Sequence, residues 1–257
     1  MIDIHSHILP GMDDGASDIE ESLAMAKIAL NDGIHTVIAT PHILNGIYPN
    51  SRSEILASTG DLRDALAKEQ IKSEVFPGSE AHLNLGMTEK IFSGEAVTLN
   101  DNKRYLLLEL PFHSIPPGAK QEIFQLQLKG ITPILAHAER NYGFQQHFEQ
   151  LYDFVGMGCL VQITAMSITG DSGREARLCA QKMLECRLAH IIATDAHSIA
   201  HRPPILSPGV KKAAKILGST EQAEEMVTAR PAAILAGEKI VIPEPELPVK
   251  KRWFSMF

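Results

Sequence analysis

The chain has 257 residues, of which 44% are hydrophobic and 21% are charged, and its formal net charge at pH 7 is -7. This length suits one barrel-type domain or two smaller domains, with enough apolar residues for a buried core. The negative charge argues against a nucleic-acid-binding surface, which usually carries a basic patch. It leaves an anionic substrate open, because bound cations reverse the local field.

Cysteine content and the start of the chain indicate an intracellular protein. The three cysteines, Cys159, Cys179 and Cys186, are too few, and odd in number, for a secreted disulfide framework. We interpret them as reduced core or helix-face residues. No charged leader and no long apolar run precedes the first predicted strand, so we expect neither a signal peptide nor a membrane span. The default expectation is a cytoplasmic location.

The first predicted strand, residues 1–7, alternates apolar and polar residues up to a His-x-His pair. Residues two apart in a strand lie on the same face, so His5 and His7 can aim both imidazoles at one point beyond the strand end. Neutral imidazole is a common ligand of divalent metals. An isolated pair of this kind is more often two unrelated surface histidines, and the later strands change that balance.

A Gly- and Asp-rich loop with Asp14 comes next, and Ser17 with Glu20 indicates a capping box at the start of a helix. The β-rich run 36–40 then ends at His42. Similar alternation continues to the end of the domain. We predict strands at 75–76, 105–109, 132–137, 160–164 and 190–195, and helices near 51–69, 87–92, 117–130, 145–157, 173–187, 208–217, 220–228 and 231–236.

The β-loop-α unit recurs about seven times, which favours an α/β fold with a parallel sheet. A closed or nearly closed barrel is better supported than a doubly wound sheet, because polar residues recur at the C-terminal ends of the strands, and these ends meet at one mouth in a barrel. We predict one domain, residues 1–242, and a Pro-rich, then basic and aromatic tail, residues 243–257. The basic and aromatic end, residues 250–257, is expected to be disordered, with docking on an anionic membrane or a partner subunit as the alternative.

The strand ends carry a candidate metal centre. Five of the 11 histidines lie there, together with several carboxylates. So many groups fit two or three ions with a bridging carboxylate, and mixed imidazole and carboxylate ligation suits zinc, manganese or iron. The absence of cysteine from the set argues against a purely structural zinc site. The candidate ligands are His5, His7, Asp14, His42, Glu80, Glu109, His137, Asp195 and His197.

These positions resemble the polymerase and histidinol phosphatase (PHP) superfamily. The motifs that carry the resemblance are His5-Ser6-His7, Asp13-Asp14-Gly15, Thr40-Pro41-His42, Pro77-Gly78-Ser79-Glu80, Leu108-Glu109, Ala136-His137-Ala138-Glu139-Arg140 and Thr194-Asp195-Ala196-His197. Within that superfamily, the chain from Met1 to about residue 240 is similar to the bacterial metal-dependent protein tyrosine phosphatases of capsule and exopolysaccharide loci. The resemblance implies a distorted (β/α)7, TIM-like barrel with two or three divalent ions, manganese first and iron, zinc or magnesium as alternatives.

The resemblance also implies roles for single residues. It assigns His5, His7, Glu80 and Asp195 to one metal, Glu80, Glu109 and His137 to a second, and Asp14, His42 and His197 to a third. Arg140 and Arg202 match arginines that clamp the phosphate, and His42 or His197 is a candidate for protonating the leaving group. Ala81-His82-Leu83, where an Ile-Arg pair is common, and Ala138, where proline is common, depart from the pattern.

The implied activity is that of a protein-tyrosine phosphatase whose partner is an autophosphorylated bacterial tyrosine kinase that controls polysaccharide export. The chain contains no Cys-x5-Arg phosphate loop, which disfavours a cysteinyl-phosphate mechanism. One alternative is a small-molecule phosphatase of the histidinol-phosphate type. Another is a metal-bound regulatory module without turnover. The sequence leaves the number of subunits open, and a homo-oligomer is one of the possibilities.

Overall fold

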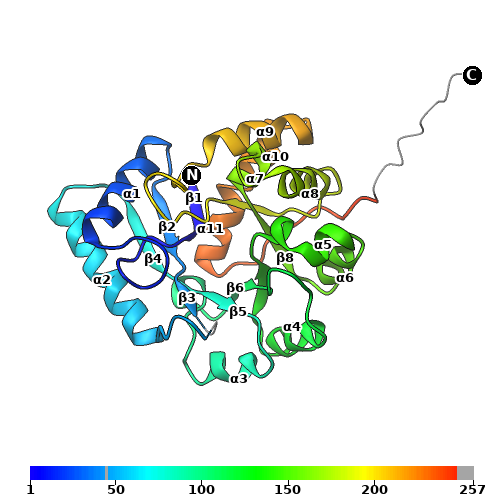
Figure 1. Cartoon of the computed structure of the whole chain (residues 1–257), viewed down its shortest axis with the longest axis horizontal. Coiled ribbons are helices and arrows are strands. Elements are labelled where there is room, and N and C mark those ends of the chain that lie inside the picture. Colours follow the sequence, from blue (N-terminus) through cyan, green and yellow to red (C-terminus); the bar gives the residue numbers. More distant parts are fainter. Residues whose placement is uncertain (44–45, 248–257) are drawn as a thin grey trace, which may run out of the picture.

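A computed structural model describes residues 1–43 and 46–247 as parallel strands surrounded by helices (Figure 1). The strands are β1 (Ile2–Ser6), β2 (Thr36–Ala39), β3 (His42–Ile43), β4 (Glu74–Pro77), β5 (Glu80–His82), β6 (Tyr105–Glu109), β7 (Thr132–Leu135), β8 (Leu160–Thr164) and β9 (Ile191–Ala193). The helices are α1 (Ile19–Asn31), α2 (Arg52–Lys68), α3 (Met87–Phe92), α4 (Ala119–Leu128), α5 (Tyr142–Gln146), α6 (Gln150–Gly156), α7 (Ala165–Thr169), α8 (Arg174–Glu185), α9 (Ser207–Leu217), α10 (Thr220–Glu225) and α11 (Ala229–Ala236), with short 3-10 turns η1 (Leu99–Asp101) and η2 (Ala138–Arg140).

The strands form a ring in chain order. β2 pairs with β4 and β3 pairs with β5, and both ladders join residue i to residue i + 38, so β2–β3 and β4–β5 are each one interrupted barrel strand. From β5 the sheet continues through β6, β7 and β8 to β9, each strand pairing with the next. The ring closes where the His7 amide donates to the Ala196 carbonyl at 2.8 Å and Ser6 bridges Ala196. The predicted (β/α)7 barrel is confirmed, and its distortion lies in the two interrupted strands.

The interruption has a local cause. At Gly78 a Cβ atom would lie 2.8 Å from Ile38 Cγ2 and 3.1 Å from the Ala39 carbonyl oxygen, so only glycine fits without a shift. On the neighbouring strand Pro41 has no amide hydrogen for the ladder. Pairing resumes directly afterwards with His42 opposite Glu80. The break therefore ends with two polar side chains next to each other at the mouth.

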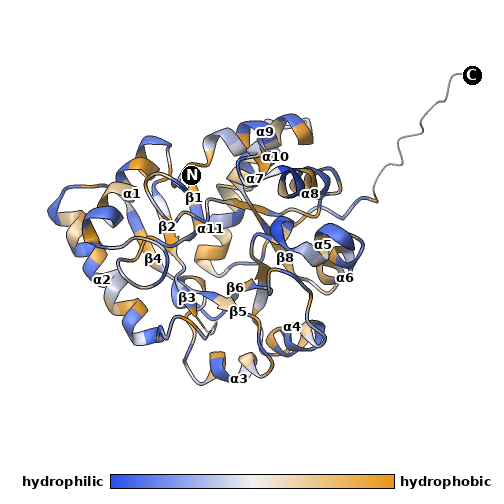
Figure 2. Ribbon diagram, viewed as in Figure 1, coloured by the Kyte–Doolittle hydropathy of each residue, from blue (hydrophilic) through white to orange (hydrophobic). Residues whose placement is uncertain are grey.

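Two apolar layers hold the barrel. One lies inside the ring and includes Ile4, Ile38, Leu107 and Ile134, together with Ile234 from α11. The other fills the space between the ring and its surrounding helices. Figure 2 accordingly shows hydrophobic strands, and helices that carry both kinds of residue. Helix α11 contacts β1 and η1, and it closes the end of the barrel opposite the mouth.

Several local helix boundaries differ from the prediction, and two of the differences have a visible cause. The N-cap of α1 is Asp18, whose side chain accepts from the Glu21 amide, so the predicted box at Ser17 is displaced by one residue. The predicted helix 145–157 is two helices, α5 and α6, separated at His147, which has φ -128° and ψ 63°. An Asn141 side chain accepts from the Phe144 amide and starts the first helix early.

The chain after α11 returns along the outside of the barrel. The Glu246 amide donates to the Cys186 carbonyl at 2.8 Å, and the Glu246 carboxylate lies 2.7 Å from Arg187 Nε. The first part of the predicted tail thus packs near the end of α8, whereas its basic and aromatic part, residues 248–257, lies outside the described residues. Among the helices that the structure describes, none has the length and hydrophobicity needed to span a membrane.

Candidate metal centre

All nine predicted ligands come together at the mouth, at or just after the C-terminal ends of strands or in the first loop. Most of them are removed from solvent: His5, His7 and Glu80 are completely buried, whereas the Asp14 side chain is 51% exposed. Their ligand atoms form four overlapping groups: His7, Asp14, His42 and His197; His5, His7 and Glu80; His5, His137 and Asp195; and His42, Glu80 and Glu109.

The deepest group joins β1, β5 and the end of β9. His5 Nε2 lies 3.3 Å from Glu80 Oε2 and 3.3 Å from Asp195 Oδ1. His7 Nε2 lies 3.4 Å from each of the same two oxygens. The two Nε2 atoms are themselves 3.2 Å apart. Four ligand atoms from segments far apart in sequence therefore surround one point.

The second group extends from the same bridging position at Glu80. His137 Nε2 lies 2.7 Å from Glu80 Oε1 and 3.8 Å from Glu109 Oε1. His42 Nδ1 lies 3.1 Å from Glu80 Oε2, so His42 also borders this group. At the position that departs from the family pattern, His82 Nδ1 lies 3.2 Å from Glu109 Oε2.

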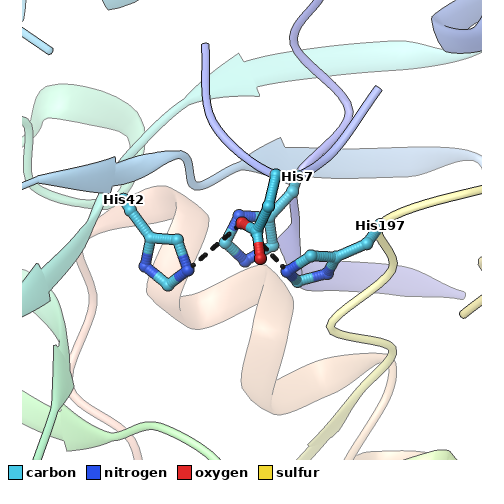
Figure 3. Close-up of side chains that lie close together, drawn as sticks. His7, His42 and His197 are labelled. Atoms are coloured by element: carbon cyan, nitrogen blue, oxygen red, sulfur yellow. Dashed lines mark ion pairs between the residues drawn. The ribbon is translucent and has the colours of Figure 1, made fainter. Parts of the chain in front are cut away.

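The third group is the most open. Asp14 Oδ1 lies 3.5 Å from His42 Nε2 and 3.5 Å from His197 Nε2. The rings of His7 and His197 have centroids 3.8 Å apart. Figure 3 shows His7, His42 and His197 pointing toward one another from separate segments of the chain. This group contains Asp14, His42 and His197 and, in addition, His7.

Supporting side chains fix which imidazole nitrogen faces the centre. Asp13 Oδ2 lies 2.6 Å from His7 Nδ1 and also accepts from the His42 amide at 2.9 Å. Gln162 Oε1 lies 3.0 Å from His5 Nδ1. With the Nδ1 atoms occupied in this way, both rings present Nε2 to the neighbouring carboxylates.

A fully buried carboxylate lies below the centre. Asp3 Oδ1 accepts from the Thr194 amide at 3.0 Å and from the His5 amide at 3.3 Å. Burial raises the pKa of Asp3 to about 6, although hydrogen bonds from Thr194 and His5 favour the charged form. Asp3 thereby ties β1 to the end of β9, the two segments that supply His5 and Asp195.

Sequence reasoning missed Asp3 and Gln162, and treated Asp13 only as part of a motif. The sequence does carry a signal for both residues, namely a polar residue inside an apolar strand. Asp3 lies between two isoleucines, and Gln162 lies between Val161 and Ile163. Such a residue needs a buried partner. The sequence does not say which partner it finds.

The backbone at the mouth is constrained. His137 and Asp195 have positive φ, 30° and 55°, a region that non-glycine residues seldom adopt and that is typical of functional sites. At Gly15 a Cβ atom would lie 2.1 Å from the His7 carbonyl oxygen. The first loop can therefore close over the histidine pair only with glycine at this position.

The charges at the centre stabilise one another against a large desolvation cost. Burial opposes charge at His7, but Asp13 and the nearby carboxylates of Asp195 and Glu80 outweigh it and raise the His7 pKa well above its usual value. Burial likewise opposes charge at Glu80, and His5 and His137 outweigh it, so its pKa lies well below the usual range. The carboxylates are therefore held ionised, as metal ligation requires.

Two observations indicate that cations fit this cluster. Among the described residues, neither Glu80 Oε2 nor His42 Nδ1 has a hydrogen bond, although both atoms are buried and only 3.1 Å apart. Buried polar atoms are rarely left without a partner. In addition, the facing Nε2 atoms of His5 and His7 need a proton or a cation between them. The donor set of imidazoles and carboxylates suits manganese, iron or zinc.

The two predicted arginines reach the same carboxylate. Arg140 and Arg202 each donate from Nη2 to Asp195 Oδ2. Burial opposes charge at Asp195, but Arg140, His5 and Arg202 outweigh it and lower the Asp195 pKa. The Arg140 and Arg202 side chains remain 22% and 32% exposed, so both guanidinium groups border the open side of the centre.

The remaining cysteines and histidines lie elsewhere. Cys159, Cys179 and Cys186 are free and buried, as predicted, and burial raises the pKa of Cys159 and Cys179 to about 12. A thiolate nucleophile is therefore disfavoured. Most histidines outside the predicted set are at least partly exposed, whereas His190 is fully buried at the other end of the barrel.

Comparisons with known proteins agree with this geometry. Residues 1–236 match the family described as capsular polysaccharide synthesis, CpsB/CapC. The chain is 37% identical to the tyrosine-protein phosphatase YwqE of Bacillus subtilis, with 98% of each chain covered. It is 34% identical to a putative tyrosine-protein phosphatase CapC of Staphylococcus aureus over the whole of both chains. With the tyrosine-protein phosphatase CpsB of Streptococcus pneumoniae the identity is 30%, covering 93% of this chain and all of that protein.

Solved structures show the same fold. A crystal structure reported for YwqE and CpsB, described as unique metal-dependent tyrosine phosphatases, superimposes with a TM-score of 0.92 at 37% identity, covering 98% of this chain and all of that one. The histidinol phosphate phosphatase of Lactococcus lactis gives a TM-score of 0.54 at 13% identity, covering 85% of this chain and 93% of the other. The second match shows a shared fold alone.

Proposed function

Because the chain belongs to the CpsB/CapC family, we propose that it is a metal-dependent protein-tyrosine phosphatase. The observation that carries the proposal is the convergence of nine imidazole and carboxylate side chains beside two arginines at one barrel mouth. A cluster of this kind suits phosphate ester hydrolysis, which needs charge neutralisation and alignment more than covalent chemistry from the protein.

The nine side chains at the mouth would hold two or three divalent ions, with manganese as the first candidate. His5, His7, Glu80 and Asp195 would hold the deepest ion, Glu80, Glu109 and His137 the second, and Asp14, His42 and His197 the outermost. When bound, such ions lower the pKa of water toward about 7 and neutralise charge on phosphoryl oxygens. Asp13 and Gln162 would keep the imidazoles oriented for this task.

Arg140 and Arg202 would bind the phosphoryl group of the substrate. A guanidinium group offers several fixed donors that match phosphate oxygens in a forked arrangement. Both side chains share one carboxylate, Asp195, and both are partly exposed. An incoming phosphate dianion can therefore take up their remaining donors without either arginine leaving the site.

The leaving group of a phosphotyrosine is a phenol with a pKa of about 10, so it needs less help from a general acid than an alkyl alcohol does. When only the two deeper ions are bound, His42 or His197 would be free of metal and would supply the proton. In His197 the Nδ1 atom lies 3.0 Å from the Asp195 carbonyl oxygen, which leaves Nε2 directed toward Asp14 at 3.5 Å. This nitrogen lies on the open side of the centre, where the leaving oxygen would depart.

The substrate would be a phosphotyrosine protein, and the bacterial tyrosine kinase that controls polysaccharide export is the first candidate. We place the catalytic domain at residues 1–242 and the reaction in the cytoplasm. The family match over residues 1–236 supports the domain boundary.

The test combines metal removal with a choice of substrates. The purified protein is stripped by a chelator, reloaded with manganese, and assayed on a phosphotyrosine peptide and on histidinol phosphate. We expect the stripped protein to be inactive, reloading to restore turnover, and the peptide to be preferred at least about tenfold. His5→Gln should lower kcat/KM at least about 10³-fold, whereas His35→Gln, on the exposed surface, should not. Undiminished turnover after complete stripping would refute the proposal.

A further inference from the structure

A groove of about 880 Å³ lies beside the start of α2 and the end of α3. One wall is the segment Gly46–Ser53, and the other comprises Lys90 and the residues Ser93, Gly94 and Glu95 after α3. This volume lies near the upper end of the range for small-molecule sites, about 300–1,000 Å³. It is larger than a single aryl phosphate needs, so the groove has room for several residues of polypeptide.

Tyr48 joins the groove to the metal centre. Its side chain lines the groove, and its ring stacks on the ring of His42 with centroids 5.8 Å apart and an interplanar angle of 7°. Partial burial together with the charges of Asp14 and Asp13 raises the pKa of the Tyr48 phenol, which agrees with a position at the edge of the carboxylate cluster.

The groove wall is anchored to the centre. Asn50 Nδ2 donates to the His42 carbonyl at 2.9 Å and to the Met12 carbonyl at 2.8 Å. Next to Tyr48, the Ile47 side chain is 74% exposed and lines the same groove. A fixed aromatic ring and an exposed apolar side chain beside a phosphate-binding centre suit a substrate with an aromatic ring and a chain attached to it.

We propose that this groove receives the polypeptide that flanks the phosphotyrosine, and that the Tyr48 ring is the surface against which the phenyl ring of the substrate packs. The inference rests on the proposed function and adds a specificity-determining residue to it. Aromatic pairs contribute about 0.5–1.5 kcal/mol beyond the burial of their area. That range corresponds to about two- to thirteenfold in kcat/KM.

The first experiment tests the ring. Manganese-loaded wild type, Tyr48→Leu and Tyr48→Phe are assayed on free phosphotyrosine and on phosphoserine. Tyr48→Leu should lower kcat/KM for phosphotyrosine by about three- to tenfold and reduce the preference for the aryl ester, mainly through KM. Tyr48→Phe, which keeps the ring, should restore that preference. An unchanged aryl preference in Tyr48→Leu would overturn the role of Tyr48 while leaving the phosphatase assignment intact.

The second experiment tests the groove. Ser53→Trp places a bulky side chain on the groove wall, and Asp61→Trp places the same side chain on the exposed surface of α2 away from it. Affinities for free phosphonomethyl-phenylalanine and for the same residue within an eleven-residue peptide are measured by calorimetry. Ser53→Trp should weaken peptide binding at least about fivefold more than it weakens binding of the free amino acid, and Asp61→Trp should weaken neither.

The binding measurement separates the two proposals. If the wild type binds the phosphonate peptide no more tightly than the free amino acid, the groove proposal is wrong even when phosphotyrosine is hydrolysed. If Ser53→Trp leaves peptide affinity unchanged and instead lowers the molecular mass in solution, the groove is an interface between copies of the chain. A wild type that hydrolyses no phosphotyrosine with manganese would overturn the proposed function and this inference together.

Discussion

His190 and Asp195 lie at opposite ends of strand β9, and both are almost completely buried, but the charges around them differ. At the mouth Asp195 contacts His5, His7 and two arginines, and its pKa is lowered. At the closed end, burial first and the Arg230 charge second lower the pKa of His190 to about 3. His190 is therefore buried and neutral, whereas Asp195 is buried and charged.

The bonds at the closed end explain this difference. His190 Nδ1 accepts from the Val161 amide at 2.9 Å, and Arg230 Nη1 donates to the His190 carbonyl at 2.9 Å. Arg230 Nη2 in turn lies 3.2 Å from Glu225 Oε2. These contacts join the strands to α10 and α11. No carboxylate is among the causes that shift the His190 pKa, so the same residue type serves the fold here and metal ligation at the mouth.

Among the variants that test this contrast, Asp195→Asn should have the largest effect. The amide cannot balance Arg140 and Arg202 or serve as an anionic ligand, so kcat/KM for phosphotyrosine should fall at least about 10³-fold and bound manganese should decrease. Kinetics and elemental analysis provide the measurements. Asp64→Asn, an exposed change on α2, is the control and should retain both. Near-normal turnover in Asp195→Asn would remove the mouth from the mechanism.

A smaller effect is expected at Gln162, which supports His5 without being a predicted ligand. Gln162→Leu removes the acceptor for His5 Nδ1 and should weaken manganese binding about 10- to 100-fold in a competition titration with a chelator. Gln162→Glu keeps an acceptor oxygen and should lose less. Equal losses in the two variants would show that packing, and not ring orientation, is what Gln162 provides.

At the closed end, Arg230→Met should lower the stability of the protein and leave its phosphatase activity unchanged. The change removes the donor to the His190 carbonyl, and an unpaired buried acceptor costs about 1–3 kcal/mol in the free energy of unfolding. Denaturant titration measures this loss, while kcat/KM is expected to stay the same. Arg174→Met, on the exposed surface, should change neither. A large loss of activity without loss of stability would contradict the division between the two ends.

The contrast between the two ends can also be tested through the pH dependence of stability, where the expected change is gradual. The unfolded His190 binds a proton below its ordinary pKa of 6.5, whereas burial and the Arg230 charge lower the pKa of the folded form to about 3. Stability is therefore lost as pH falls through this window, by about 1.4 kcal/mol per pH unit from this group. His190→Asn keeps an acceptor for the Val161 amide and should show a slope smaller by that amount. Parallel curves for the two proteins would mean that His190 titrates normally.

Much of the barrel could be predicted because its signals are local. The run from Tyr105 to Glu109 is apolar up to its last residue, and the structure has β6 over that span. The predicted helix 51–69 is α2, with Ser51 and Glu54 forming its capping box. Period, caps and breakers act within a few residues of chain, so they can be read directly from the sequence.

Other features depend on residues that are distant in sequence. His5 and Gln162 are 157 residues apart, and Thr194 and Asp3 are 191 apart. No local pattern pairs them. The same holds for the burial of His190, which comes from α11 closing the barrel and not from the residues next to it.

By itself the sequence determined that strands alternate with helices and that His, Asp and Glu residues follow the strands, because hydrophobic period and strand ends are properties of short segments. Only the tertiary structure decided which of these side chains share a point, which nitrogen of each ring faces inward, and which buried histidine is left outside the cluster. Those choices depend on closure of the ring between β1 and β9, where backbone hydrogen bonds bring together residues from the two ends of the domain.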